Sequence, residues 1–369
     1  MMQGRLFMPS NLKRPLNYVE AIREAFDQSM AKDSNVIVIG EGVPDPKAIF
    51  GSTAGLRQKY GAHRVFDMPL SENGLTGICI GAAISGLRPV LIHQRIDFAL
   101  LSIDQLFNNA AKWHYMFNGK ATVPMVVRMI VGRGWGQGPQ HSQSLQALFA
   151  LIPGLKVVMP TTAHDAKGML NAAIQDNNPV IFIEHRWLHP VVDDVPEDYY
   201  EVPLDKAKII QSGKDLTLAA FSYMTLESLV AVRALKEVLG IEVELIDMRS
   251  IRPLDVPCVR QSVQKTGHLI VADTAYKTGS IGAELISQLV ESDFASFKSA
   301  PIRIASPDFP TPTGPSMTDG YYPTPVQIAD AVLTSLGKSI SASERNQLDA
   351  LLVRKSLHDV PSRDFVGPF

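Results

Sequence analysis

Apolar residues follow two different spacings along the first half of the chain. Residues 35–40 form an almost continuous apolar run, typical of a strand that is buried on both faces of a parallel sheet. Ahead of it, Val19, Ile22 and Phe26 recur at three- and four-residue intervals and predict a helix over 18–31, with Asn17 as its N-cap. The same alternation continues to residue 184. It predicts helices over 71–85, 102–116 and 163–175, and strands over 88–93, 123–131 and 179–184.

The pattern lapses between residues 186 and 208 and then resumes. That interval is rich in proline and acidic residues, and we interpret it as a linker. Beyond it the spacing predicts strands over 215–221, 242–247, 268–273 and 302–305, and helices over 225–239, 255–266, 281–291 and 326–336. The last stretch, 337–369, is polar except for one amphipathic segment around Leu348, Leu351 and Leu352, and we interpret it as an appended tail.

Strands that alternate with helices of this length predict an α/β fold whose sheets carry helices on both faces. The length of 369 residues suits two domains. Hydrophobic residues make up 46% of the chain and charged residues 20%, a globular balance that excludes global disorder.

Charge and cysteine content narrow the function classes. The net charge of -2 offers no basic field for nucleic acid or for an anionic membrane surface. The apolar run 74–86 is too short and too glycine-rich to span a bilayer, and the first residues lack the apolar core of a secretory signal. The two cysteines, Cys79 and Cys258, lie far apart, which argues against a disulfide framework and suits a reducing cytoplasm.

Three segments combine residues that could carry chemistry. A glycine-rich stretch over 131–143 ends near His141, which could transfer protons near neutral pH or could simply bond a turn carbonyl. Ser71 and Glu72 begin a predicted helix, where a cap and a first-turn acid are the ordinary interpretation. The turn 176–179 could end a helix or could surround a hard cation with oxygens.

Several other kinds of site are not indicated. The chain has no phosphate-binding loop of the P-loop type, no dinucleotide fingerprint after the first strand, and no nucleophile elbow. His185 and His189 are four residues apart, but Pro190 follows directly and no glutamate is placed as a base, so a zinc pair is not expected.

Taken together, these segments resemble a known family. The stretches PLSENG, GAAISGLRPV, DFALLSIDQLFNNAAKWHYM, GPQHSQS, IPGLKVVMP, DAKGMLNAAIQDNNPVIFIEH, SIRPLD and GSIGAE are similar to the β subunit of thiamine-diphosphate-dependent 2-oxoacid dehydrogenases of the pyruvate, branched-chain and acetoin types. The likeness runs in order from about residue 16 to about residue 336 and is weakly specific for the substrate.

The resemblance implies a domain order and a partner. We expect an N-terminal arm over 1–15, a pyrimidine-binding, transketolase-like three-layer domain over 16–185, the linker 186–208, a transketolase C-terminal-like α/β domain over 209–336, and a C-terminal extension over 337–369. In the family an α subunit supplies the Gly-Asp-Gly motif that holds magnesium and the diphosphate, in an α2β2 heterotetramer. This chain has no such motif in the right context, so it resembles half of an active site. A lipoyl acyltransferase is a further expected partner.

The resemblance also assigns site residues. It implies that thiamine diphosphate is bound by Glu41, Leu70, Glu72, Gln94 and Phe98. Glu72 matches the glutamate that bonds the pyrimidine N1′, and His141 matches the histidine at the reacting centre, so these two are the expected catalytic residues.

A potassium site is implied as well. Its expected ligands, mainly backbone carbonyls, belong to Met125, Ala173, Ile174, Asp176 and Asn178.

The chain departs from the family near the expected substrate. Arg133 and Trp135 stand where the family has small residues, so with His141 they are expected to contact a substrate that is larger or more polar than pyruvate. His93 and Arg95 replace more apolar residues.

Two rivals stay open beside the dehydrogenase subunit. One is a subunit of a split transketolase or an acyloin-forming carboligase, which would join carbon atoms without a lipoyl partner. The other is a non-catalytic structural subunit, against which the joint presence of Glu72, Phe98 and His141 argues.

Overall fold

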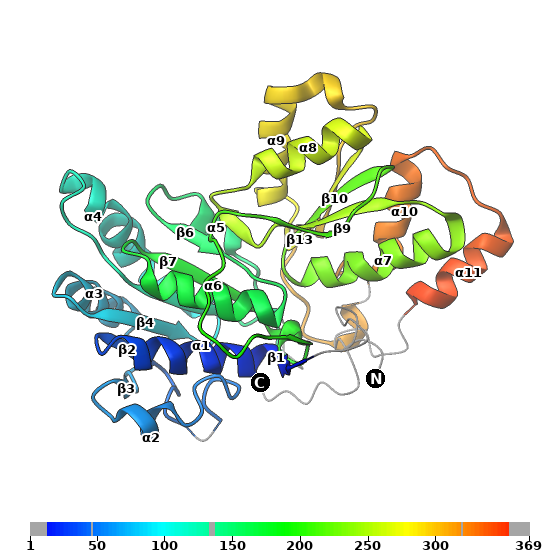
Figure 1. Ribbon diagram of the computed structural model, residues 1–369. Coiled ribbons are helices and arrows are strands. Elements are labelled where there is room, and N and C mark those ends of the chain that lie inside the picture. The colour runs from blue at the N-terminus through cyan, green and yellow to red at the C-terminus, as the bar shows by residue number, and fades with distance from the viewer. Residues whose placement is uncertain (1–12, 46, 133–136, 319, 354–369) are drawn as a thin grey trace. The chain divides into compact units, whose positions relative to one another are not determined.

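The structure is a computed structural model that describes residues 13–45, 47–132, 137–318 and 320–353 (Figure 1). The chain divides into two compact units, with the boundary between Leu204 and Asp205. Among the described residues, no helix combines the length and apolar content needed to cross a membrane.

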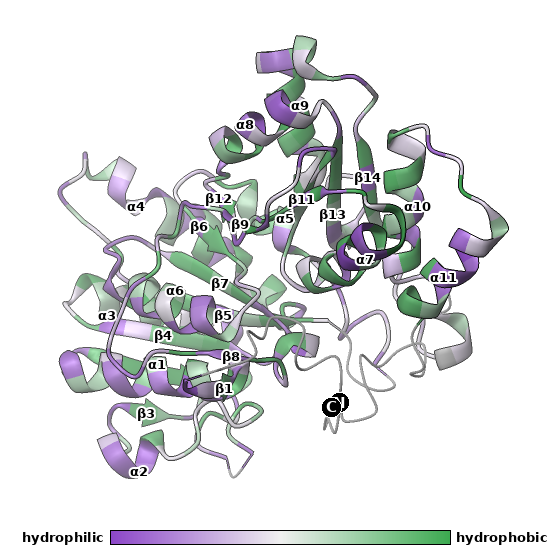
Figure 2. Ribbon diagram, turned by 45° about the vertical axis from the view of Figure 1, so that its right-hand side comes forward, coloured by the Kyte–Doolittle hydropathy of each residue, from purple (hydrophilic) through white to green (hydrophobic). Residues whose placement is uncertain are grey.

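The first unit is built on a parallel sheet. Its strands are β2 (Val36–Gly40), β3 (Val65–Phe66), β4 (Arg88–His93), β5 (Val126–Val131), β6 (Lys156–Val158) and β7 (Val180–His185). Within this unit they lie in the order β6-β7-β5-β4-β2-β3, and every neighbouring pair is parallel. The side chains of β4, β5 and β7 are nearly all buried, and Figure 2 shows β5 and β7 in the hydrophobic colour.

Helices and short turns surround that sheet. They are α1 (Tyr18–Lys32), α2 (Leu56–Tyr60), α3 (Glu72–Ile84), η2 (Phe98–Ser102), η3 (Gln105–Ala110), α4 (Ala111–Met116), α5 (Gln146–Ala150), α6 (Ala163–Gln175) and η4 (Arg186–Leu188). Helix α1 begins as predicted, because Asn17 accepts from the Glu20 amide while the Glu20 side chain bonds back to Asn17. Its apolar stripe packs on α6 (Figure 1).

The predicted helix over 102–116 is not a regular helix. It consists of the π-helical turn η3 followed by the short α4, with the 3₁₀ turn η2 before them. The predicted strand over 123–131 also begins later, at Val126, because Pro124 has no amide hydrogen to give to the ladder.

The stretch predicted as a linker, 186–208, has structure of its own up to residue 204. The strand β8 (Val192–Asp194) pairs antiparallel with β1 (Pro15–Asn17), and the side chains of Trp187, Leu188 and Val195 are buried. These residues belong to the first compact unit, which runs to Leu204, and the second unit begins at the next residue. Proline and acidic content alone did not reveal the apolar side chains that anchor the stretch.

The second unit follows the predicted alternation closely. Its strands are β9 (Lys208–Gln211), β10 (Leu216–Ala220), β11 (Val243–Asp247), β12 (Ser250–Arg252), β13 (Leu269–Tyr276) and β14 (Ile302–Ser306). Its helices and turns are α7 (Tyr223–Leu239), α8 (Val256–Thr266), α9 (Ile281–Asp293), η5 (Phe294–Ser296), η6 (Pro315–Met317), α10 (Pro325–Ser335) and α11 (Ala342–Leu352).

A five-stranded sheet in the order β14-β13-β10-β11-β9 forms the centre of this unit. Its pairs are parallel except for β9 with β11. Helices α8 and α9 lie on one side of the sheet and α7 and α10 on the other (Figure 1). The amphipathic segment of the tail forms α11, which packs on α7 and buries Leu348 and Leu352.

Candidate active site at the carboxyl edge of the first sheet

The expected cofactor residues gather where parallel strands of the first sheet end. Glu41 follows the last residue of β2, Gln94 follows the last residue of β4, and Glu72 is the first residue of α3. The side-chain amide of Gln94 donates to the backbone carbonyl of Glu41 at 3.1 Å, which ties the ends of β2 and β4 together. This edge is where ligands bind in open α/β sheets.

At the start of α3, the Glu72 carboxylate makes no hydrogen bond to the described residues and could bond a ligand. Ser71 occupies the N-cap position, but its side chain makes no capping hydrogen bond, so the predicted cap is wrong in that respect. The Glu72 carbonyl instead accepts from the hydroxyls of Thr76 at 2.7 Å and Ser102 at 3.2 Å, which anchors η2 on α3. The Glu72 side chain is buried and makes no hydrogen bond within the described residues.

A second carboxyl faces the same space. Burial raises the pKa of the Glu41 carboxyl, and the negative charges of Glu72 and Asp67 raise it further. The Glu41 Oε1 atom is buried without a hydrogen-bond partner in the described residues. The raised pKa favours the protonated form of the Glu41 carboxyl.

An aromatic ring and a histidine complete the cluster. The ring of Phe98 meets the imidazole of His141 edge-on, with centroids 5.5 Å apart and an interplanar angle of 86°. His141 is exposed, and its backbone amide donates to the Gly138 carbonyl at 3.2 Å. The imidazole is therefore held in position by a ring contact while its surface stays open.

Sequence reasoning missed the clamp that supports this pair. Asp97 Oδ1 accepts from the side-chain amide of Gln143 at 2.8 Å and from its backbone amide at 3.4 Å. Because Asp97 precedes Phe98 and Gln143 follows His141 by two residues, the clamp fixes both rings at once. Burial raises the pKa of the Asp97 carboxyl. The position of Asp97 and Gln143 next to predicted site residues was the available signal.

The glycine-rich loop leaves β5 through a strained position. Gly132 has φ +86°, and a Cβ built on it would lie 2.5 Å from Cε1 of His185. The Gly132 carbonyl accepts from the Arg95 guanidinium. Only glycine fits there. Arg133 and Trp135, the expected substrate residues in this loop, lie outside the described residues.

Several large apolar side chains near Glu72 in the sequence or on contacting elements are exposed to solvent. Leu70 is 82% exposed, Ile78 on α3 is 63% exposed and Leu101 on η2 is 62% exposed. Ile78 and Leu101 belong to elements that contact each other, and Leu70 precedes α3 by two residues. Uncovered apolar surface next to a cluster of site residues is typical of an interface.

The turn expected to hold potassium is well ordered. The Met125 carbonyl accepts from the Val180 amide at 3.0 Å, and the Ala173 carbonyl accepts from the Asp176 amide at 3.3 Å. The Asn178 amide donates to the Asp176 carboxylate at 2.9 Å. No group of three or more histidine, cysteine or acidic side chains gathers for a metal in the described residues, so any cation here would rest on backbone oxygens.

Side-chain cations already contact these oxygens. The Arg88 guanidinium donates to the carbonyls of Ile174 at 3.1 Å and Asp176 at 3.0 Å, and the Lys156 ammonium pairs with the Asp176 carboxylate. Each carbonyl retains a second lone pair, and hard oxygen ligands suit a potassium ion. Two cationic side chains thus already contact these oxygens, and the potassium site stays a prediction.

The histidines at the end of β7 and just after η4, His185 and His189, bond to neighbouring side chains and backbone. His189 contacts the Glu184 carboxylate through Nε2 at 3.2 Å and Arg186 through Nδ1 at 3.0 Å, and His185 accepts from the Trp187 amide. Glu184 also forms a fully buried ion pair with Arg128. Both imidazoles are held by these partners within the core.

Comparisons with known proteins agree with this architecture. The family described as transketolase, pyrimidine binding domain matches residues 14–191, and that described as transketolase, C-terminal domain matches residues 205–328. A solved structure titled a split gene transketolase, inactive beta4 tetramer, superposes with a TM-score of 0.69 over 86% of this chain and 97% of that chain, at 20% identity. That likeness shows the fold.

Curated relatives share much more sequence. The acetoin:2,6-dichlorophenolindophenol oxidoreductase subunit beta of Cupriavidus necator is 41% identical over 87% of this chain and 97% of its own length. The corresponding subunit of Bacillus subtilis is 42% identical over 89% and 99%. The pyruvate dehydrogenase E1 component subunit beta of Porphyra purpurea is 41% identical over 87% and 96%. With both transketolase domains matched and nearly the whole length of these relatives covered, the chain belongs to the family of β subunits of pyruvate and acetoin dehydrogenases.

Proposed function

We propose that this chain is the β subunit of a thiamine-diphosphate-dependent enzyme that decarboxylates a 2-oxoacid and passes on the acyl or aldehyde unit. The observation that carries the proposal is the Glu41–Glu72 carboxyl pair beside Phe98 and His141. When bound, thiamine diphosphate supplies a nucleophilic carbon that attacks the 2-oxoacid and lets it lose carbon dioxide. The cytoplasm is the proposed setting, because both cysteines are free thiols.

Glu72 has the central role in this proposal. Its buried carboxyl, which makes no hydrogen bond to the described residues, would bond the N1′ nitrogen of the pyrimidine. Glu41 is proposed to support Glu72, since the raised pKa of the Glu41 carboxyl favours its protonated form. Phe98 and Leu70 offer apolar contact to the ring, and Gln94 fixes the Glu41 backbone from the neighbouring strand.

His141 is assigned to the substrate. Its imidazole is exposed and is positioned by the Phe98 ring, so it can donate to or accept from a group beyond the pyrimidine. The Asp97–Gln143 clamp keeps the imidazole at that place. Arg133 and Trp135 remain proposed substrate contacts.

The remaining half of the site is assigned to an α subunit. The chain lacks a motif for the diphosphate and its magnesium ion, and the apolar face around Leu70, Ile78 and Leu101 needs a cover. We therefore propose an α2β2 assembly whose α subunit holds magnesium, with a lipoyl acyltransferase as a possible acceptor of the acyl group.

Potassium is proposed at the turn 173–178. Its support is the set of carbonyl oxygens around Asp176. Thermal unfolding in potassium chloride and in lithium chloride at equal ionic strength tests this. The midpoint temperature of unfolding should be higher in potassium chloride than in lithium chloride, because the smaller lithium ion holds its water too strongly to exchange it for fixed carbonyl oxygens. Equal midpoint temperatures in the two salts would contradict the site.

The experiment for the proposed function uses the assembled enzyme and two variants. Glu72→Ala should abolish hydrogen–deuterium exchange at the thiazolium C2 atom, whereas His141→Ala should retain that exchange and slow turnover about 100- to 10,000-fold. Exchange is followed by proton NMR after rapid quench. Normal exchange in Glu72→Ala would refute the assignment of Glu72 and with it the proposed site.

A further inference from the structure

The residues that follow β4 are bonded to the start of the glycine-rich loop. The Ile96 amide donates to the Ile130 carbonyl of β5 at 3.0 Å, and the Arg95 guanidinium donates to the Gly132 carbonyl. Gly132 lies just beyond the last residue of β5, where the ladder ends, so its buried carbonyl takes its bond from a side chain. Arg95 is only 3% exposed, and its positive charge makes this a charge-assisted hydrogen bond.

The other end of the same loop is bonded to the same segment. Asp97, two residues after Arg95, accepts from the side-chain and backbone amides of Gln143. The stretch 95–97 therefore holds both ends of the loop 132–143. Burial raises the pKa of the Asp97 carboxyl, while the bonds from Gln143 and the charge of Arg95 oppose that rise, so the two anchors are also linked electrostatically.

The position of His141 depends on both anchors, because His141 lies within this loop. Its imidazole meets the ring of Phe98 edge-on, and Phe98 directly follows the anchoring stretch 95–97. Within the described residues the imidazole makes this ring contact and no hydrogen bond. The course of the loop backbone therefore decides where the imidazole stands.

The sequence sets both the stretch and the loop apart. Arg95 stands where an apolar residue is expected, and Arg133 stands where a small residue is expected. The two departures meet at one bond, because Arg95 donates to the carbonyl of Gly132, the residue that precedes Arg133. An apolar side chain at position 95 could not make this bond.

We propose that Arg95 is a positioning residue for the reaction. It fixes the start of the loop through the Gly132 carbonyl and, together with Asp97 at the other end, sets where His141 stands against the substrate. Arg95 acts through the loop and does not itself touch the substrate. The inference rests on the proposed function, because it takes His141 as the residue that faces the substrate.

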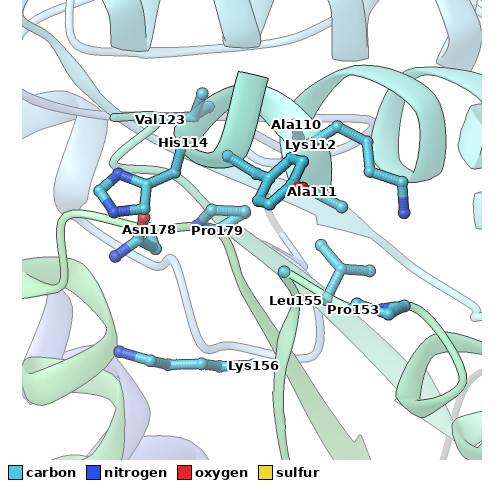
Figure 3. Close-up of a pocket in the computed structure, with 12 residues that line it drawn as sticks. Ala110, Ala111, Lys112, His114, Val123, Pro153, Leu155, Lys156, Asn178 and Pro179 are labelled. Carbon is cyan, nitrogen blue, oxygen red and sulfur yellow. The ribbon is translucent and has the colours of Figure 1, made fainter. Parts of the chain in front are cut away.

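The anchor is separate from a cavity in the same unit. That cavity has a volume of about 590 Å³ and is lined by residues of α4, of the turn before β6 and of the stretch before β7 (Figure 3). None of its lining residues belongs to 94–97 or to the described part of the loop. Lys112, one of the lining residues, is half-buried like Gln143 and thus offers a control within the first unit.

Trypsin cleavage after Arg133 tests the anchor directly. In the purified full-length chain, Arg95→Leu removes the donor to Gly132, so cleavage after Arg133, followed by mass spectrometry, should be at least about tenfold faster than in wild type. Arg95→Lys keeps a charged donor and should stay within about threefold. Arg64→Leu is the matched control, because Arg64 donates to backbone carbonyls elsewhere in the first unit, and it should stay within about twofold.

Turnover tests whether Arg95 acts through His141. The assembled enzyme is assayed with pyruvate and with acetoin as probes, by the reduction of 2,6-dichlorophenolindophenol. Arg95→Leu should lower kcat/KM about 100-fold, the cost of misplacing an active-site group by about 1 Å, and should leave C2 exchange as in wild type. In the His141→Ala background the same change should cost less than about threefold, because no imidazole is left to misplace.

Gln143→Ala examines the other anchor and takes the place of Arg95→Leu if that variant does not fold. It removes the side-chain bond to Asp97 and should lower kcat/KM about tenfold in the wild-type background but less than about threefold in the His141→Ala background. Lys112→Ala is its matched control and should stay within about twofold of wild type.

The outcomes separate this inference from the proposed function. Equal rates of cleavage after Arg133 in wild type and Arg95→Leu would overturn the anchor. If Arg95→Leu costs as much in the His141→Ala background as in wild type, Arg95 does not act through His141, and the inference is overturned while the proposed function stands. If the wild-type assembly shows no C2 exchange, the proposed function fails, and cleavage after Arg133 still decides whether Arg95 holds the loop.

Discussion

Three histidines are buried in the first unit without becoming charged. Burial lowers the pKa of His93 to about 4, of His185 to about 3 and of His189 to about 4. These values lie below the ordinary 6.5, so the unfolded chain binds more protons than the folded chain between about pH 4 and pH 6.5. The free energy of unfolding must therefore fall as the pH decreases through that window.

His93 offers a direct measurement of this effect. It is 3% exposed and its Nε2 atom has no partner in the described residues, so His93→Leu should preserve the packing and remove one titrating group. Urea unfolding between about pH 5 and pH 6.5 should then show a slope shallower by about 1 kcal/mol per pH unit, since the unfolded imidazole is partly protonated in that range. Ile92→Val on the same strand is the control, which should lower stability without changing the slope. An unchanged slope in His93→Leu would show that its imidazole is charged in the folded state.

At the same scale, the sequence indicates candidate site residues but not their support. Glu72, Phe98 and His141 each stand in a motif, and their roles stay predictions. Asp97 and Gln143 hold them, but an acid and an amide 46 residues apart show no relation until the loop brings them together. Ser71 illustrates the opposite error: serine before a helix favours a side-chain cap, yet the carbonyl of Glu72 makes the contacts that anchor this start.

Among the elements, regular ones were predictable and interrupted ones were not. Strands β4 and β7 match their predicted ranges within a residue, because a run of consecutive apolar residues in each suits a parallel sheet. The region 98–116 has helical spacing too, but a π-turn there shifts the register, and spacing alone does not show such a shift. Strand β8 was missed because antiparallel pairing with β1 depends on residues far away in the sequence.

Helix α11 allows a quantitative test of how the tail is held. Leu348 is fully buried against the rest of the second unit, whereas Leu351, one turn along, is 44% exposed. Leu348→Ala should lower the free energy of unfolding of the second unit by about 2–5 kcal/mol, because it leaves a cavity beside α7. Leu351→Ala is the matched control and should change it by less than about 0.5 kcal/mol. Equal effects in urea unfolding would mean that α11 does not pack on α7 as described.

The ion pair of Arg345 on α11 with Asp330 is exposed and adds little to the free energy of unfolding.

Across the whole molecule, the chemistry is unevenly distributed. The first unit brings together two carboxyls, an aromatic ring and an imidazole, and it leaves apolar surface beside them uncovered. The sequence supplies no motif for a diphosphate and its metal. The fold class followed from the sequence alone, whereas the incompleteness of the site stays a prediction.

The isolated chain should therefore fail to bind thiamine diphosphate. The residues proposed for the cofactor, among them the exposed Leu70 and the half-buried Phe98, would hold only its pyrimidine, and the charged diphosphate would stay in water. Isothermal titration of the purified chain with thiamine diphosphate and magnesium should give no measurable heat of binding. Adding the α subunit should restore micromolar affinity, because the two halves then enclose the cofactor, and Glu72→Ala should weaken that affinity without preventing assembly. Micromolar binding by the chain alone would show that its own residues hold the diphosphate, and the half-site interpretation would have to be abandoned.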